Sequence, residues 1–150
     1  LYIEARVKVD AITNVYVYFG VTDQKIALEA PIESAGAADT ITTTATDSVG
    51  FMFDTRMATD NIWLVGVNND VDEATQNSAL AFVADTYRIL RIELTTAGNA
   101  SFYIGGTLIG TVMTTACRTS VPLYPTLAVS ATGAASRTET IDYLYVRQDT

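Results

Sequence analysis

The run Asn68–Glu73 is the part of this 150-residue sequence whose residue types could most readily do chemistry, because five of its six side chains carry oxygen. Calcium binds about six to eight oxygen ligands in proteins, and an acidic loop can supply several of them. The run lacks the glycine at its sixth position and the glutamate at its twelfth that an EF-hand requires. It therefore predicts either a calcium site formed by Asn68, Asp70, Asp72 and Glu73, or a solvated acidic turn.

Catalytic residues are harder to find. The sequence contains no histidine, which removes the commonest general base and the commonest transition-metal ligand. Asp54 ends the apolar run Val49–Asp54, but the residues two and four positions further on are Arg56 and Ala58, so no second carboxylate shares its face. The sole cysteine, Cys117, cannot form an intrachain disulfide and is expected to be an ordinary free thiol. The residues therefore predict no catalytic site, no cofactor other than calcium, and a protein that is not an enzyme.

Aromatic residues offer a third kind of chemistry. Two pairs each share one face of an expected strand, Tyr16 with Tyr18 and Tyr143 with Tyr145. Together with Trp63 and Tyr103 they could stack on sugars, or they could serve as core residues and cross-strand pairs. A pair that faces water would favour a protein interface or a ligand platform.

The elements that must position these residues are strands. Apolar residues alternate with polar ones along most of the chain, and no segment keeps a helical period. The expected strands are Leu1–Asp10, Asn14–Val21, Gln24–Pro31, Val49–Asp54, Asn61–Val67, Ala79–Ala84, a three-stranded meander in Tyr87–Val112, Tyr124–Ser130 and Glu139–Arg147. Ile32–Ser48 is expected to be a long loop, and Asn68–Ser78 and Thr114–Ser120 shorter ones. Ten to twelve short strands predict an all-β fold of two stacked antiparallel sheets.

The length and the net charge of the chain limit the kinds of partner that the protein can have. A chain of 150 residues fits one domain spanning residues 1–150, and because it opens inside a strand it is expected to be one domain of a longer polypeptide. The net charge of −8 disfavours contact with nucleic acid and with anionic membranes. No apolar run approaches the ~18 residues of a membrane helix. The sequence thus predicts no nucleic-acid partner and no membrane partner.

The chain resembles the concanavalin A-like jelly roll, which legume lectins and laminin G-like domains share. The resemblance rests on the strand and hairpin run YRILRIELTTAGNASFYIGGTLIGTV, on the opening LYIEARVKVD and on the closing TIDYLYVRQ. It implies a sandwich whose first and last strands lie side by side, and it raises the prospect of calcium at a loop tip. The laminarinase-like enzymes of this class carry an E-x-D-x-x-E run, which this sequence lacks.

The closing strand and the loops rich in threonine and alanine also resemble proteins of tailed-bacteriophage virions. That resemblance implies a non-enzymatic structural protein, made in the host cytoplasm and built into the virion. Its expected role is capsid decoration or cement through protein–protein adhesion, with capsid or other virion proteins as partners and with homo-oligomers formed. The alternative is a carbohydrate-binding, lectin-like module for host or glycan attachment, including a tail fibre domain.

Overall fold

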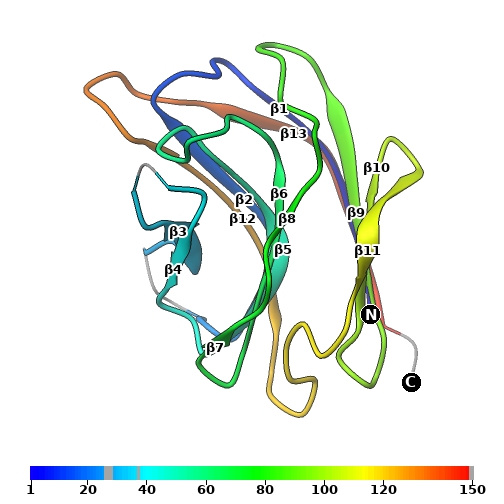
Figure 1. Cartoon of the computed structure of the whole chain (residues 1–150). Coiled ribbons are helices and arrows are strands. Elements are labelled where there is room, and N and C mark those ends of the chain that lie inside the picture. The colour runs from blue at the N-terminus through cyan, green and yellow to red at the C-terminus, as the bar shows by residue number, and fades with distance from the viewer. Residues whose placement is uncertain (26–28, 37, 149–150) are drawn as a thin grey trace.

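The computed structural model describes residues 1–25, 29–36 and 38–148. Within them the chain forms two antiparallel sheets that pack face to face as a sandwich (Figure 1). Sheet A has the strand order β11 (Thr107–Met113), β10 (Ala100–Ile104), β9 (Arg88–Leu94), β1 (Tyr2–Val9) and β13 (Glu139–Arg147). Sheet B has the order β12 (Tyr124–Ala131), β2 (Val15–Thr22), β5 (Asp47–Asp54), β6 (Trp63–Asn68) and β7 (Val71–Asp72), with β8 (Gln76–Asn77) also on β6. The predicted all-β fold of two stacked antiparallel sheets is confirmed.

The core between the sheets follows from the alternation of apolar residues. On β1 every second side chain, from Ile3 to Val9, is buried, while the intervening ones are half-buried. Phe51 of β5 lies parallel to Phe19 of β2, with ring centroids 6.4 Å apart, and meets Phe102 of β10 edge-on at 5.3 Å. Burying one such ring contributes roughly 1.5–3 kcal/mol, so these rings help hold the two sheets together.

The predicted meander is confirmed as β9, β10 and β11. The β10–β11 hairpin turns at Gly105 and Gly106, whose φ angles are +59° and +85°. Two consecutive positive φ angles fit a tight type I′ turn, which glycine adopts without steric strain. β1 pairs with β13 along its whole length, as the resemblance to the jelly roll implied.

A separate hairpin of β3 (Ile32–Ser34) and β4 (Ile41–Thr43) covers the outer face of sheet B, on the side away from sheet A (Figure 1). A second apolar cluster fills this layer, and Tyr16, Tyr18, Met52 and Trp63 are buried in it. The Tyr18 ring lies directly against Gly50, where a Cβ atom would be only 2.5 Å from the ring. Glycine in this central strand therefore makes the space that the tyrosine occupies.

Four expected elements are corrected. The described residues of Gln24–Pro31 are not a strand, because β2 pairs with β5 and β12 instead, and residues 26–28 of that range lie outside the described residues. Ile32–Ser48 is not one long loop, since it contains β3, β4 and the start of β5. Ala79–Ala84 is not a strand: Phe82 is buried in the core, but the segment is not paired with a strand. Asn68–Ser78, expected as a loop, includes the two-residue strands β7 and β8.

The closing strand differs from its expected alternation. The register with β1 shifts between Arg6, which pairs with Tyr143, and Val7, which pairs with Ile141. Asp142 is therefore the extra residue of a β-bulge. Because of this extra residue, side chains on the two sides of the bulge no longer follow one continuous alternation. Ile141 consequently points to the same side as Leu144, and not to the side of Tyr143 as a strict alternation predicts.

No helix in the described part of the chain is long and apolar enough to cross a membrane.

Candidate binding face on sheet A

The outer face of sheet A carries an unusual set of tyrosines and arginines. It consists of side chains that point away from the core along β1, β9, β10 and β13, together with Tyr87 just before β9, and no described segment covers it (Figure 1). We call this surface the tyrosine face: Tyr2, Glu4, Arg6, Lys8, Tyr87, Arg91, Glu93, Tyr103, Asp142, Tyr143, Tyr145 and Arg147. It holds five of the eight tyrosines and four of the nine basic side chains.

Arg91 lies at the centre of the tyrosine face. Its guanidinium carbon is 3.8 Å from the centroid of the Tyr103 ring and 5.7 Å from that of Tyr2. Its Nε lies 3.5 Å from a carboxylate oxygen of Glu93, and this Nε has no hydrogen-bond partner. Burial alone would lower the pKa of Arg91, but Tyr2 and Glu93 outweigh it and the pKa is raised. A permanent charge is thus held between two aromatic rings.

Glu4 fixes two of the tyrosines. It accepts hydrogen bonds from the hydroxyl of Tyr2 at 2.8 Å and from that of Tyr143 at 2.7 Å. The hydrogen bond to Glu4, followed by burial, raises the pKa of Tyr143 to about 12. The pKa of Tyr2 is raised as well, first by burial and then by Glu4. Both phenols are therefore neutral donors at physiological pH, and their rings are held in place before any partner arrives.

The remaining aromatic residues extend this arrangement toward both ends of β1. The Tyr2 ring meets the Tyr145 ring at 5.6 Å with an interplanar angle of 80°. At the other end Arg6 lies 4.2 Å above the Tyr87 ring and also binds Asp142 at 2.6 Å. Tyr2 and Tyr145 are nearly perpendicular rather than coplanar, so these two rings do not form a flat stacking platform.

A shallow cavity of about 360 Å³ adjoins the tyrosine face at the Tyr87 end. Arg6 and Arg88 line it together with apolar groups that include Leu80 and Ile104. It could receive one projecting side chain of a partner, with apolar walls and two guanidinium groups at the rim.

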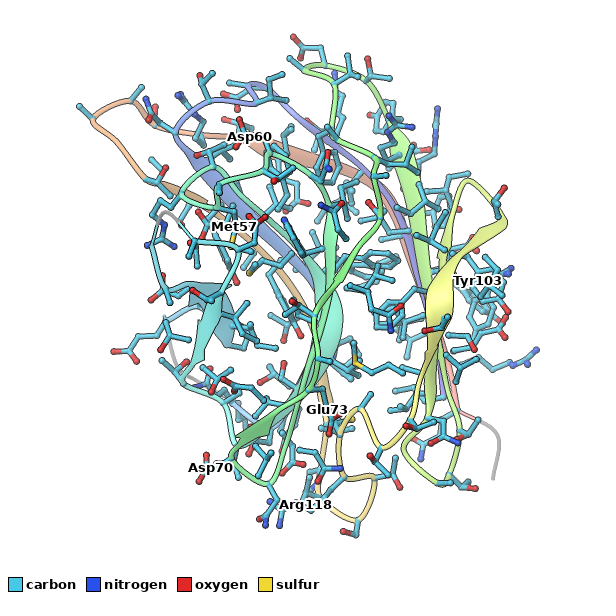
Figure 2. The ribbon with its side chains drawn as sticks, in the orientation of Figure 1. Met57, Asp60, Asp70, Glu73, Tyr103 and Arg118 are labelled. Atoms are coloured by element: carbon cyan, nitrogen blue, oxygen red, sulfur yellow. The ribbon has the colours of Figure 1, made fainter. Side chains whose placement is uncertain are left out.

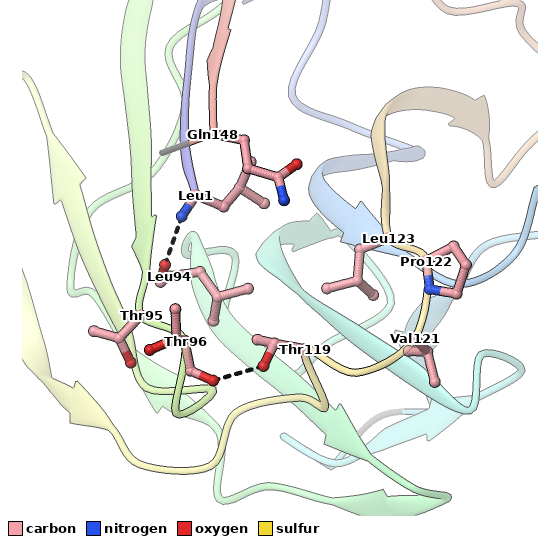
Figure 3. Close-up of a pocket in the computed structure, with 9 residues that line it drawn as sticks. All are labelled: Leu1, Leu94, Thr95, Thr96, Thr119, Val121, Pro122, Leu123 and Gln148. Carbon is pink, nitrogen blue, oxygen red and sulfur yellow. Dashed lines mark hydrogen bonds between the residues drawn. The ribbon is translucent and has the colours of Figure 1, made fainter. Parts of the chain in front are cut away.

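A larger cavity of about 520 Å³ opens between the two sheets at the other end of the sandwich (Figure 3). Leu94, Val121, Pro122 and Leu123 supply apolar walls, and Thr119 donates a hydrogen bond to a backbone carbonyl there. No carboxylate or basic side chain lines it among the described residues. The cavity is a gap in side-chain packing, and no acidic or nucleophilic cysteine side chain lines it among the described residues.

The candidate calcium ligands sit on a tight hairpin between β6 and β7. Asn69 and Asp70 both have positive φ, 52° and 63°, which fits a two-residue turn (Figure 2). Asn68 donates to the carbonyl of Thr115, and Asp72 accepts from Thr43. No cluster of three or more acidic or cysteine side chains suited to a metal occurs among the described residues. Calcium at Asn68, Asp70, Asp72 and Glu73 stays a prediction.

The most buried carboxylate near that hairpin is bound by a cation of the protein itself. Asp47 is fully buried and accepts hydrogen bonds from the Arg118 guanidinium at 2.5 and 2.8 Å and from two backbone amides. Burial alone would raise the pKa of Asp47, but the hydrogen bonds from Arg118 lower it. Cys117 is buried beside this pair, and burial raises its pKa to about 12, so it is an unreactive thiol as expected.

Asp54 has a structural role on the other side of the sandwich. Its carboxylate is fully buried and accepts from the backbone amide of Ser34 and from the Arg56 side chain. Arg56 reaches Glu33 as well, at 2.7 Å. The two acids are thus bridged by one guanidinium, and the bridge ties the β3–β4 hairpin to sheet B. Asp54 has no free lone pair turned toward solvent with which to act on a substrate.

The predicted aromatic residues divide between the two outer faces. Tyr16, Tyr18 and Trp63 are buried beneath the β3–β4 hairpin, so they form core rather than a platform. Tyr143 and Tyr145 lie on the uncovered face, opposite Arg6 and Glu4 of β1. Tyr103 lies on the same face (Figure 2). The sequence did not single out Tyr2, Glu4 and Arg91, although every one of them occupies a polar position on an amphipathic strand.

No family model matches the sequence, and no curated protein matches it. Among solved structures the chain is similar to a native glycosidic hydrolase, with a TM-score of 0.56 and 16% sequence identity. The match covers 95% of this chain and 62% of the hydrolase, so the chain spans less than two thirds of that enzyme's length. At this identity the similarity shows the fold alone, which is a β-sandwich of the kind that the sequence predicted.

This similarity corrects the prediction that the chain is not an enzyme. That prediction rested on the absence of histidine and of an E-x-D-x-x-E run, whereas the fold proves to be one that a glycosidic hydrolase also uses. The missing run excludes one arrangement of carboxylates, and it does not exclude the enzyme class that uses this sandwich.

Proposed function

We propose that this chain is an adhesion domain that binds a partner protein through the tyrosine face of sheet A. The proposed setting is a tailed-bacteriophage virion, in which the domain decorates or cements the capsid. The virion setting rests on the resemblance of the closing strand and loops to proteins of such particles, and it implies assembly in the host cytoplasm.

One observation carries the proposal, namely the concentration of tyrosine and arginine on an uncovered sheet. These two residue types dominate the residues that contribute most to binding in protein interfaces. The tyrosine face carries four basic and three acidic side chains on a chain whose net charge is −8, so it is close to neutral while the rest of the chain is acidic. Because Glu4 and Arg91 already hold the rings, little side-chain entropy is lost on binding.

Carbohydrate binding is the second candidate. It is favoured by the shared fold with a glycosidic hydrolase and by the mixture of carboxylates, arginine and tyrosine on one surface. Sugars stack best on flat aromatic surfaces, however, and Tyr2 and Tyr145 meet at 80°. The geometry therefore supports a protein partner better than a glycan.

The test is co-sedimentation of the purified chain with capsids of the phage that carries its gene, before and after Arg91→Glu. The variant reverses the central charge on the tyrosine face, and a loss of binding of at least tenfold is expected. Arg137→Glu is the control, since Arg137 is partly exposed on the β12–β13 connection, away from the tyrosine face, and donates to the backbone carbonyls of Thr13 and Ser136.

Three outcomes are informative. Capsid binding by the wild type and by Arg137→Glu, with loss in Arg91→Glu, supports the proposal. Equal loss in both arginine variants contradicts the assignment of the tyrosine face. No capsid binding, together with retention on a glycan array that Arg91→Glu abolishes, replaces the protein partner with a carbohydrate.

A further inference from the structure

Three of the four outer edges of the two sheets carry a feature that hinders further pairing. On β11 the side-chain amide of Gln76 accepts from the amide of Thr111 at 2.8 Å and donates to its carbonyl at 3.2 Å. On β12 the ring of Pro125 removes one backbone donor. The edge at β7 is only two residues long. Short edges, proline and occupied backbone groups are the usual means by which a protein prevents strand addition.

The fourth edge, β13, carries its bulge at Asp142 and the inward-facing Glu139 in its first half, and neither device in Tyr143–Arg147. It is nine residues long, contains neither proline nor lysine, and no described strand pairs with its free side. Four of its side chains are large, apolar and between 44% and 50% exposed: Ile141, Leu144, Tyr145 and Val146. A long apolar edge of this kind is a template for another strand.

The apolar side chains of β13 include some that point toward the core. Leu144 pairs with Ala5 and Val146 with Ile3, and both of these β1 residues are buried. Leu144 and Val146 face the same way but remain half-exposed. The interior of the sandwich is thus left open along β13, where a neighbouring strand would complete it.

We infer that β13 pairs with β13 of a second copy of this chain, antiparallel about a two-fold axis. A register centred on Tyr145 places Leu144 opposite Val146 of the other copy, twice, on the core side. On the outer side it places Tyr143 opposite Arg147 of the other copy, also twice, and in antiparallel sheets such directly opposed side chains contact each other. The strand is therefore self-complementary, as a two-fold interface requires, and its polar contacts repeat the arginine–tyrosine contact of Arg91 and Tyr103.

Such a dimer joins two copies of sheet A into one continuous sheet, with their tyrosine faces side by side. The inference stands independently of the proposed function, because it rests on the edge of the sheet and not on what the face binds. It specifies a two-fold dimer, whereas the sequence analysis predicted homo-oligomers without giving their size.

The first test is sedimentation equilibrium of the wild type and of Leu144→Lys. An inward-pointing lysine on an edge strand opposes pairing, so the dimer dissociation constant is expected to rise at least tenfold. The control for an added surface charge on the other edge is Leu108→Lys, since Leu108 is 49% exposed on β11, where it pairs with Tyr103 and faces outward. A monomeric wild type at ~100 µM, far above ordinary dimer affinities, would overturn the inference, and so would equal weakening by the control.

The second test fixes the register. Directly opposed residues in antiparallel strands have Cα atoms about 4.5–5.5 Å apart, which suits a disulfide. Tyr145→Cys is therefore expected to form a covalent dimer under mild oxidation, whereas Tyr103→Cys, at the middle of the sheet, is not. The native Cys117 is buried and gives little background. Equal cross-linking of both variants contradicts the register, and cross-linking of Tyr145→Cys only to a different protein contradicts self-pairing.

Discussion

Each outer face of the sandwich carries a pair of tyrosines at alternate positions of one strand. One face is covered by another segment of the chain, and the other is not. On sheet B, Tyr16 and Tyr18 are buried beneath the β3–β4 hairpin. On sheet A, Tyr143 and Tyr145 stand on a surface that no described segment covers. Both pairs arise from the same alternation along a strand, so alternation decides which side chains share a face. What covers that face is decided by a segment elsewhere in the chain.

The largest expected contrast is in stability. Tyr18→Ala removes a fully buried ring whose hydroxyl is bonded to Ser48 and to the Val21 carbonyl, and it should lower the free energy of unfolding by ~3–5 kcal/mol. Tyr145→Ala removes a half-exposed ring and should lower it by less than ~1 kcal/mol. Urea unfolding of the two variants measures the difference. Similar losses in both would show that the outer face of sheet A is as much a part of the core as that of sheet B.

A smaller effect is expected where the covering hairpin is attached. Asp54→Ala leaves the amide of Ser34 and the Arg56 side chain without their shared acceptor, and should cost ~2–3 kcal/mol. Glu33→Ala removes the partly exposed partner of the same arginine and should change stability by less than ~1 kcal/mol. Thermal unfolding compares the two. If Glu33→Ala were the more damaging, the buried carboxylate would not be what holds the hairpin.

The smallest effect is in the ionisation of the tyrosines. Burial raises the pKa of Tyr16 and of Tyr18 well above the usual value of 10, whereas Tyr143 rises to about 12 through Glu4 and burial. A raised pKa in the folded state means that ionisation favours unfolding. The stability contributed by neutral Tyr143 is therefore complete below pH 10 and lost as the pH rises toward 12.

Ultraviolet titration checks this prediction. Tyr143→Phe should remove one transition near pH 12 from the folded protein, whereas Tyr16→Phe should change only the step that accompanies unfolding. A Tyr16 transition in the folded protein below that of Tyr143 would contradict the assignment of covered and open faces.

Much of the fold could be predicted from local pattern. The boundaries of Arg88–Leu94 and Glu139–Arg147 follow from alternation, and the Gly105–Gly106 turn follows from the need for positive φ. The β3–β4 hairpin could not, because its two three-residue strands carry too few alternating positions to stand out from a loop. The bulge at Asp142 could not be predicted either, because it depends on the register with β1 and not on any residue type.

The candidate site, too, could be predicted only in part from the local sequence pattern. Tyr103, Tyr143 and Tyr145 were identifiable as aromatic residues on strands, but their association with Arg91 and Glu4 depends on the order of β10, β9, β1 and β13 in sheet A. Three of these strands are far apart in the sequence. A strand pattern gives the face of each side chain, and only the strand order brings the side chains of several strands together.

The most direct test of the proposal that the tyrosine face is the binding surface is hydroxyl-radical footprinting of the chain alone and with the proposed capsid partner. The account predicts that Tyr103 and Tyr145 become protected on binding, while Tyr124, on β12 of sheet B, reacts at an unchanged rate. Protection of Tyr124 with Tyr103 and Tyr145 unaffected would place the partner on sheet B and contradict the account.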